Sequence, residues 1–479
     1  MADQHRADVL GCAGDPSAHT PTLDRLAADG VRFSRVTCQG PLCMPARASF
    51  ATERYVRDHG VYTNWAEIAP DSPTYMHALR DAGYHTVLLG KAHLYRDETH
   101  TAGHVDELAP RLAALGFAEV YETGDKFSVS TRNPYLDALR DRGVLGDYAR
   151  YIADRSYQGE NETGRGATKR VPMWEATPSP LPPSLYIDAF HGELAARWIE
   201  HYGGDAPFFA FVGFPGPHDP WDAPADAVDR YAAVEMTMPR STKRPDVERA
   251  GRYGRLLGAF LHLSDTETMT GDAIRAMRRA YAANVTVIDD AVARIVAALD
   301  AKGLLDDTWV LYTSDHGEMA GDHGLMSKCV MYDGAVNVPL IVRSPRGAAV
   351  TRGAVVDALV EHVDVPATLR DIAGADELPH SVGRSLLPYL RGDDPEPRSV
   401  SISENWGFAS FVTDRYKLVV DEDACAPCQL FDRRDDPCEN ENLVDDPLHA
   451  DAVEQLMAER VRPFFATAPT RPHRSPFTG

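Results

Sequence analysis

The chain repeatedly alternates a helical segment with a short, almost wholly apolar run that ends at a polar side chain. The apolar runs are residues 85–89, 207–214 and 308–314, and the long amphipathic segment 272–301 precedes the third. Continuous apolar runs between helices are typical of strands that are covered on both faces of a sheet. The pattern therefore predicts an α/β fold with a large, mostly parallel sheet flanked by helices.

Polar side chains follow each of these runs at the point where the strand is predicted to end. They are Lys91, His93, His218, Asp315 and His316. In open α/β sheets ligands bind at the carboxyl ends of the strands. A lone histidine is usually structural, whereas three histidines, a lysine and an aspartate in equivalent places favour a functional site. We therefore predict that these five side chains converge.

The character of the sequence changes at about residue 397. Short alternating runs follow at 399–403, 408–412 and 416–420, then a turn-rich acidic segment and a closing helix at 447–465. A chain of 479 residues is also too long for one small core. We predict a catalytic domain over residues 1–395 and a small C-terminal α+β domain with an antiparallel sheet over residues 396–479.

Charge and cysteine content exclude several classes of function. The net charge of −22 argues against nucleic acid and, unless a local basic patch overrides it, against long polyanions, and it is compatible with a small ligand held in a pocket. No apolar run approaches the ~18 residues of a membrane span, so no membrane partner is predicted. The seven cysteines, an odd number without a signal peptide, predict a reduced, cytoplasmic protein.

Cys43 stands at the start of a predicted helix, with Arg47 one turn further along the same face. Two interpretations are open. Free cysteine is among the most buried residue types, so Cys43 could simply be packed in the core. Alternatively, the backbone N–H groups of a helix start favour negative charge, which suits a cysteine that takes part in chemistry. Two long, weakly periodic segments, 158–183 and 222–270, are predicted to form pocket walls.

A series of motifs resembles the type I, formylglycine-dependent sulfatase family of the alkaline phosphatase superfamily. Cys43-Met44-Pro45-Ala46-Arg47 with Thr52-Glu53-Arg54 is similar to its signature, C-x-P-[S/A]-R followed by T-G-R. The other motifs, in the family's order, are Asp3-Gln4, Gly90-Lys91-Ala92-His93, Pro217-His218-Asp219-Pro220, Ser314-Asp315-His316-Gly317-Glu318, Asp322-His323-Gly324-Leu325-Met326-Ser327-Lys328 and Arg415-Tyr416-Lys417-Leu418. The resemblance covers nearly the whole chain and implies the alkaline-phosphatase-like fold.

The resemblance also implies a reaction, the hydrolysis of a small sulfate ester. A separate formylglycine-generating enzyme would oxidise Cys43 to formylglycine, an aldehyde whose hydrate supplies the nucleophilic hydroxyl, while the second hydroxyl later expels sulfate. A divalent metal would lower the pKa of the attacking hydroxyl. The residues implied as metal ligands are Asp3, Gln4, Cys43, Asp315 and His316.

The remaining site residues are expected to handle substrate and protons. A guanidinium suits two oxygens at once, so Arg47 would hold the diol. Lys91 and Lys328 would bind the sulfate oxygens, and Asn64 is a further substrate-binding candidate. His93 would take the proton of the second hydroxyl. His218 would be the general acid for the leaving oxygen, because histidine titrates near neutral pH.

Three departures from the family pattern bear on the metal. Gln4 stands where many members have aspartate, and His316 where many have asparagine. Calcium prefers oxygen ligands, whereas a histidine moves a site toward manganese, so calcium is expected, with manganese as the alternative. Only two residues precede Asp3, where the family has an apolar strand. We therefore expect a missing strand and weak metal binding by this chain.

Two other functions remain open. Phosphonate monoester or phosphodiester hydrolysis would use the same formylglycine machinery, and Lys91 favours the sulfatase. An inactive relative would keep Cys43 as a thiol, which the complete set of site residues argues against. The alcohol that carries the sulfate is not encoded in any motif, although the acidic balance favours a small neutral or cationic one.

Overall fold

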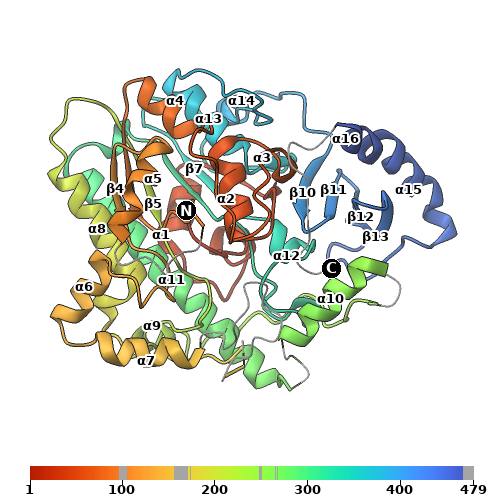
Figure 1. Ribbon diagram of the computed structural model, residues 1–479, viewed down its shortest axis with the longest axis horizontal. Helices are drawn as coiled ribbons and strands as arrows, with labels where there is room; N and C mark the ends of the chain where they lie inside the picture. Colours follow the sequence, from red (N-terminus) through yellow and green to blue (C-terminus); the bar gives the residue numbers. More distant parts are fainter. Residues whose placement is uncertain are drawn as a thin grey trace.

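The predicted apolar runs form strands at the centre of the larger part of the molecule (Figure 1). The structure is a computed structural model that describes residues 1–96, 105–155, 171–172, 174–247, 251–264, 266 and 268–467. The strands are β1 (Val31–Phe33), β2 (Val36–Thr37), β3 (His85–Gly90), β4 (Glu119–Glu122), β5 (Phe208–Gly213), β6 (Val310–Thr313), β7 (Leu340–Arg343), β8 (Ala354–Val356), β9 (Val360–Glu361), β10 (Ser401–Asn405), β11 (Phe408–Val412), β12 (Tyr416–Asp421) and β13 (Ala426–Asp432).

Helices surround these strands. They are α1 (Pro21–Ala28), α2 (Cys43–Thr52), α3 (Val56–His59), α4 (Tyr75–Asp81), α5 (Ala109–Ala114), α6 (Pro134–Asp141), α7 (Leu145–Arg155), α8 (Ile187–His201), α9 (Ala225–Asp229), α10 (Gly251–Ser264), α11 (Gly271–Ala301), α12 (Asp333–Val336), α13 (Asp364–Ala373), α14 (Leu387–Arg391), α15 (Ala450–Leu456) and α16 (Arg462–Ala466). In the part of the chain that the structure describes, no helix is both long and apolar enough to cross a membrane.

The central strands form two adjoining sheets, one parallel and one mixed. In one sheet, of order β4-β3-β5, both pairings are parallel. In the other, of order β6-β7-β1-β8, β7 runs antiparallel to both of its neighbours, and β1 pairs parallel with β8. The predicted α/β class is confirmed, with the antiparallel β7 making the sheet mixed.

The first three residues lie between the ends of β5 and β6 and link the two sheets. The backbone N–H of Ala2 donates to the carbonyl of Thr313 at 2.8 Å, and that of Asp3 donates to the carbonyl of Gly216 at 3.0 Å. The Met1 amino group donates to the carbonyl of Val212. These bonds place Asp3 and Gln4 at the carboxyl ends of the two strands.

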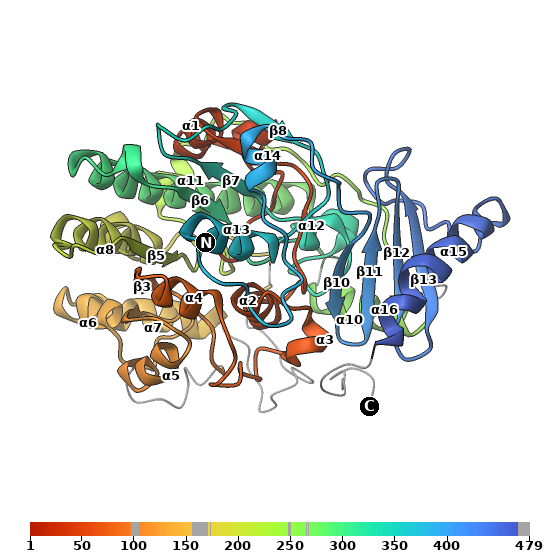
Figure 2. The ribbon, with the colours of Figure 1, turned by 90° about the horizontal axis from the view of Figure 1, so that it is seen from above.

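Helices cover both faces of the central sheets, as Figure 2 shows from above. On one face, α11 packs against α8 and contributes Ile288 and Val292 to a cluster with Tyr312 and Ile341. On the other, α2, α4 and α13 pack together over apolar side chains that include Phe50. Because both faces are covered, β3, β5 and β6 are mostly apolar rather than alternating, as the sequence indicated.

The C-terminal strands β10 to β13 form one antiparallel sheet in chain order. Side chains alternate between its two faces. Leu418 and Val420 pack with Leu456 near the C-terminal helices, whereas Val419 between them belongs to the core of the larger part. Both faces of this small sheet are therefore covered, and the boundary at residue 395 stays a prediction.

Three segments differ from their predicted structure. Strand β13 lies within 421–446, predicted as turns, because Leu430 and Phe431 pair with β12. Helix α10 lies within 222–270, the weakly periodic segment that is predicted to form a pocket wall. The predicted closing helix is divided into α15 and α16 by a wider turn, Met457–Val461. Much of the predicted wall 158–183 lies outside the described residues.

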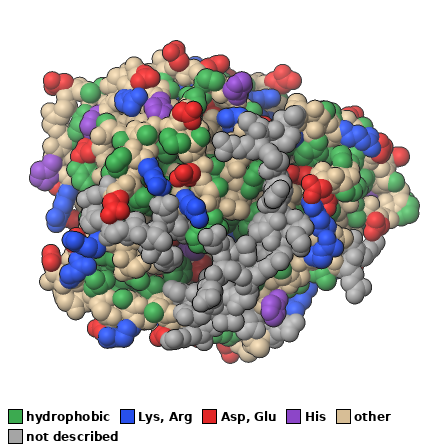
Figure 3. Space-filling view, in the orientation of Figure 1, with side chains coloured by type: hydrophobic (Ala, Val, Ile, Leu, Met, Phe, Trp, Pro, Cys, Tyr) green, Lys and Arg blue, Asp and Glu red, His purple; other side chains and the backbone are tan. Residues whose placement is uncertain are grey.

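On the face drawn in Figure 3, basic side chains are scattered among acidic and apolar ones.

Candidate active site

Cys43 is the first residue of α2 and is fully buried, with 1% of its surface exposed. Its Sγ lies 3.2 Å from Nε2 of His316 and 3.8 Å from Oδ1 of Asp3. Burial, together with the charge of Asp3, raises the pKa of the Cys43 thiol to about 12. The nearby Lys328 and Lys91 lower the pKa but do not offset this effect, so the unmodified side chain is a neutral thiol at physiological pH. A thiolate nucleophile is therefore not what this environment supports.

Asp3, Cys43, Asp315 and His316 each direct one candidate ligand atom to a common point, with all four atoms within 4.8 Å of one another. Asp315 and His316 directly follow β6, and Asp3 follows the N-terminal bridge. The His316 Nδ1 lies 2.9 Å from the carbonyl of Gly317, so Nδ1 carries the proton and Nε2 faces the cluster unprotonated. Two carboxylates and a neutral imidazole with an oriented ring fit a divalent metal.

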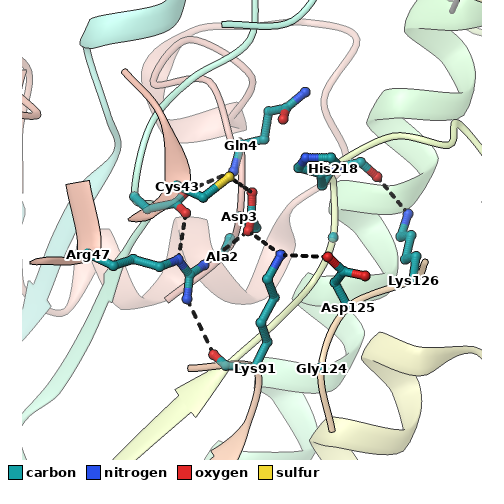
Figure 4. A network of polar contacts seen from close by, with 12 residues as sticks. Ala2, Asp3, Gln4, Cys43, Arg47, Lys91, Gly124, Asp125, Lys126 and His218 are labelled. Atoms are coloured by element: carbon teal, nitrogen blue, oxygen red, sulfur yellow. Dashed lines mark hydrogen bonds and ion pairs between the residues drawn. The ribbon is translucent and has the colours of Figure 1, made fainter. Parts of the chain in front are cut away.

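The charges within this cluster are balanced by two buried cations, shown in Figure 4. Arg47 Nε donates to Asp315 at 2.7 Å, and a second guanidinium nitrogen lies 3.2 Å from Asp3. Lys91 Nζ lies 2.7 Å from the same Asp3 carboxylate. Burial alone would raise the pKa of Asp3, but Lys91, His218 and Arg47 together hold it well below its usual range. Asp3 is therefore ionised.

His218 and Lys328 form a second pair at the site. The Lys328 Nζ lies 2.6 Å from Nε2 of His218, while His218 Nδ1 lies 2.8 Å from the carbonyl of Asp219. A carbonyl can only accept, so Nδ1 carries the proton of the neutral ring and Nε2 accepts from the ammonium. Burial, with the charge of Lys328, lowers the pKa of His218 to about 4. The mobile proton of this pair therefore resides on Lys328.

Gln4 lies between Lys328 and Glu318. Its Nε2 donates to Glu318, and its Oε1 accepts from Lys328 Nζ. Glu318 is held in turn by the backbone N–H groups of Ala320 and Ser327. In this arrangement the Gln4 amide oxygen is bonded to an ammonium, and its role as a metal ligand stays a prediction.

The two remaining predicted residues lie beside this core. Asn64 accepts a hydrogen bond at 3.0 Å from the backbone N–H of Met44, next to Cys43. His93, which is 7% exposed, has a left-handed backbone with φ of 48° and helps to lower the pKa of Asp125. The five polar residues that follow the apolar runs thus lie at one end of the sheets.

Two neighbours of the site, Asp125 and Glu318, have roles that no pattern in the sequence predicts. Asp125 lies 3.6 Å from Lys91 Nζ, and Lys91 with His93 and His218 offsets burial to keep the pKa of Asp125 low. It follows β4, whose polar sequence Glu119-Val120-Tyr121-Glu122 lacks the apolar pattern of the other strands. Glu318 is the last residue of the motif that holds Asp315, but its contact with Gln4 spans 314 residues.

Two family models and several known proteins match the chain. Residues 1–375 match the family model described as Sulfatase, and residues 321–463 match the model described as N-sulphoglucosamine sulphohydrolase, C-terminal. The choline-sulfatase of Rhizobium meliloti (strain 1021) is 30% identical over 93% of this chain and 82% of its own length.

Two further proteins are similar over nearly the whole chain. The multifunctional alkaline phosphatase superfamily protein PehA of Trinickia caryophylli is 29% identical over 95% of this chain and 92% of its own. The crystal structure of the phosphonate monoester hydrolase of Agrobacterium radiobacter superposes with a TM-score of 0.79 and 26% identity, covering 97% of this chain and 94% of that one.

Proposed function

Because this chain belongs to the sulfatase family, whose members are sulfuric ester hydrolases, we propose that it hydrolyses a small sulfate monoester with a nucleophile derived from Cys43. The observation that carries the proposal is the environment of Cys43. A buried thiol with a pKa of about 12 lies against two carboxylates, an imidazole and two lysines. The thiol itself is a poor nucleophile there, whereas an oxygen at the same position would face all the groups that ester hydrolysis needs.

Formylglycine is the modification that places oxygen at this position, with a formylglycine-generating enzyme as the partner that acts on Cys43. The intact Cys43-x-Pro45-x-Arg47 core supports this step. A hydroxyl of the hydrated aldehyde would take the place of the Cys43 Sγ. The 3.2 Å separation of this Sγ from His316 Nε2 puts such a hydroxyl within hydrogen-bond range of the metal-ligand candidates.

The chain's own residues explain how the anionic ester would be held. Lys91 and Lys328 are both close enough to Cys43 to lower the pKa of its thiol, with Lys91 on Asp3 and Lys328 on Gln4, and Asn64 lies beside the start of α2. Fixed positive charge directed at a sulfate group stabilises the charge that develops as the ester bond breaks. Arg47 is already engaged by Asp3 and Asp315, so it would hold the diol while keeping those carboxylates in place.

Release of the alcohol requires a proton on the leaving oxygen. The Lys328–His218 pair holds one proton between two nitrogens that are 2.6 Å apart. Such a pair can donate a proton to the leaving oxygen and later take up another proton from solvent, which is the function of a general acid. His93 is the candidate that takes the proton of the second hydroxyl.

A divalent metal held by Asp3, Asp315 and His316, with Gln4 as a further candidate, would lower the pKa of the attacking hydroxyl when it is bound. The two carboxylates favour calcium, and the imidazole of His316 makes manganese the alternative. The chain's residues prepare the site by keeping both carboxylates ionised and His316 neutral.

Hydrolysis of a phosphonate monoester or phosphodiester is the second candidate, favoured by the similarity to the phosphonate monoester hydrolase of Agrobacterium radiobacter. We favour the sulfate ester because the Sulfatase family model matches residues 1–375 and because Lys91 would bind a sulfate oxygen. The test is a matched panel of an aryl sulfate, a phosphate diester and a phosphonate monoester, with Cys43→Ser as control. The highest kcat/KM is expected for the sulfate, and a clear preference for either phosphorus ester would reject it.

A further inference from the structure

We propose that the turn between β10 and β11, residues 405–407, is a positioning element that holds the two segments carrying Asn64 and Lys328 at a fixed separation. The turn belongs to the C-terminal sheet, yet two of its side chains reach backbone groups of the larger part of the molecule. The kinetic part of this inference rests on the proposed function, whereas the structural part does not.

The first contact is made by Asn405. Its Nδ2 donates at 2.9 Å to the carbonyl of Cys329, the residue that follows Lys328. Ser327 and Cys329, on either side of Lys328, both have left-handed backbones, with φ of 70° and 73°. Non-glycine residues persist in this region only where their surroundings fix them. The Asn405 amide is one such restraint, so we infer that it fixes the direction in which Lys328 projects.

The second contact is made by Trp406. Its indole N–H donates at 3.0 Å to the carbonyl of Tyr62, two residues before Asn64. Trp406 is 8% exposed and has a φ of 49°, followed by Gly407 at 83°. A two-residue hairpin turn with both φ values positive favours Asn-Gly, and a tryptophan in its first position is strained. We infer that the strain is retained because the indole reaches Tyr62 from this position.

A third contact anchors the turn beside the nucleophile. The backbone N–H of Glu404 donates at 2.8 Å to the carbonyl of Gln39, four residues before Cys43. The pairing of Asn405 with Phe408 makes the turn the end of a regular antiparallel ladder. One rigid strand end therefore touches the segments that carry Cys43, Asn64 and Lys328. A displacement of about 1 Å in such a constellation costs on the order of 100-fold in rate.

The test uses Asn405→Ala and Trp406→Phe, each of which removes one of these hydrogen bonds, in the full chain. Asn442→Ala is the control, because Asn442 lies beside β13, away from the site. Its Nδ2 donates to the Cys428 carbonyl at 3.2 Å, and its Oδ1 accepts from the backbone N–H groups of Leu430 and Val444, so the variant loses at least as many hydrogen bonds as the test variants. Hydrogen exchange should rise around residues 327–331 in Asn405→Ala and around 60–64 in Trp406→Phe. After activity is normalised to the fraction of protein with a converted Cys43, we expect kcat/KM for a sulfate ester to fall roughly 10-fold or more in each variant. In the control it should fall less than twofold.

The effects should also differ in kind. Asn405→Ala loosens Lys328 and should lower kcat most for esters with poor leaving groups, whereas Trp406→Phe loosens Asn64 and should mainly raise KM. Exchange that rises equally in both segments, or kinetic losses no larger than those of Asn442→Ala, would overturn the inference. If the wild-type protein hydrolyses no sulfate ester, the proposed function fails, and the exchange measurement still decides whether the turn positions these segments.

Discussion

Replacing Glu53 with alanine should destabilise the fold by about 3–5 kcal/mol, because it leaves a buried charge without its partner. Glu53 caps the C-terminal end of α2, the helix that begins at Cys43, and it is fully buried. Its two carboxylate oxygens each lie 2.7 Å from a guanidinium nitrogen of Arg370, which is 5% exposed. Ser381 donates to the same carboxylate.

Glycine at this position should be less harmful than alanine. Glu53 has a left-handed backbone with φ of 57°, and the signature that the segment resembles has glycine here. The left-handed conformation costs an L-residue roughly 1–2 kcal/mol, and glycine avoids this cost. Because glycine also has more conformational freedom in the unfolded chain, its advantage over alanine is smaller than the full cost. Glu53→Gly should therefore be more stable than Glu53→Ala by about 1 kcal/mol, although both lose the ion pair.

Urea denaturation followed by tryptophan fluorescence measures both differences. Glu67→Ala is the control, because Glu67 pairs with Arg111 at 3.4 Å where both side chains are nearly half exposed. Such exposed pairs contribute at most about 1 kcal/mol. A loss in Glu53→Ala no larger than in Glu67→Ala would refute the argument from the buried pair. Equal stability of the alanine and glycine variants would refute the argument from φ.

Three further predictions follow from the site and its supports. His218→Ala should lower kcat about 100-fold for an alkyl sulfate but less than 10-fold for a nitroaryl sulfate, which needs little protonation; equal losses would contradict a general-acid role. Burial raises the pKa of Asp188 from 3.8 to about 6, so the folded state binds the proton more tightly and loses stability as the pH rises between these values. The free energy of unfolding of Asp188→Asn, measured by urea titration, should therefore rise relative to that of the wild type by up to about 3 kcal/mol from pH 4 to pH 8. A difference in stability between the two proteins that does not change with pH would contradict this cause. Removing metal with a chelator should abolish hydrolysis, and calcium should restore it; recovery with manganese alone would select the alternative metal.

Much of the fold and the core of the site could be predicted because local sequence encodes them. Lys91, His218 and Asp315 follow the carboxyl ends of the apolar strands β3, β5 and β6. They lie at one end of the sheets because of the direction of these strands alone. Asp125 was missed because the sequence of β4 is polar.

Long-range contacts explain what the sequence could not provide. The bond between Trp406 and Tyr62 joins residues 344 positions apart, and nothing local to either residue indicates it. The same holds for the contact of Gln4 with Lys328, which depends on how the N-terminal bridge meets β6. Only the packed structure reveals that Cys43 is a neutral thiol rather than an activated one.

The central claim is that a modified Cys43 supplies the nucleophile. The most direct measurement is intact-mass spectrometry of protein made with and without a formylglycine-generating enzyme, combined with sulfatase turnover on the same samples. Conversion of the thiol to the aldehyde removes about 18 Da, and turnover should rise in proportion to the converted fraction. Full turnover by protein that retains the thiol mass, or no turnover by converted protein, would contradict the claim.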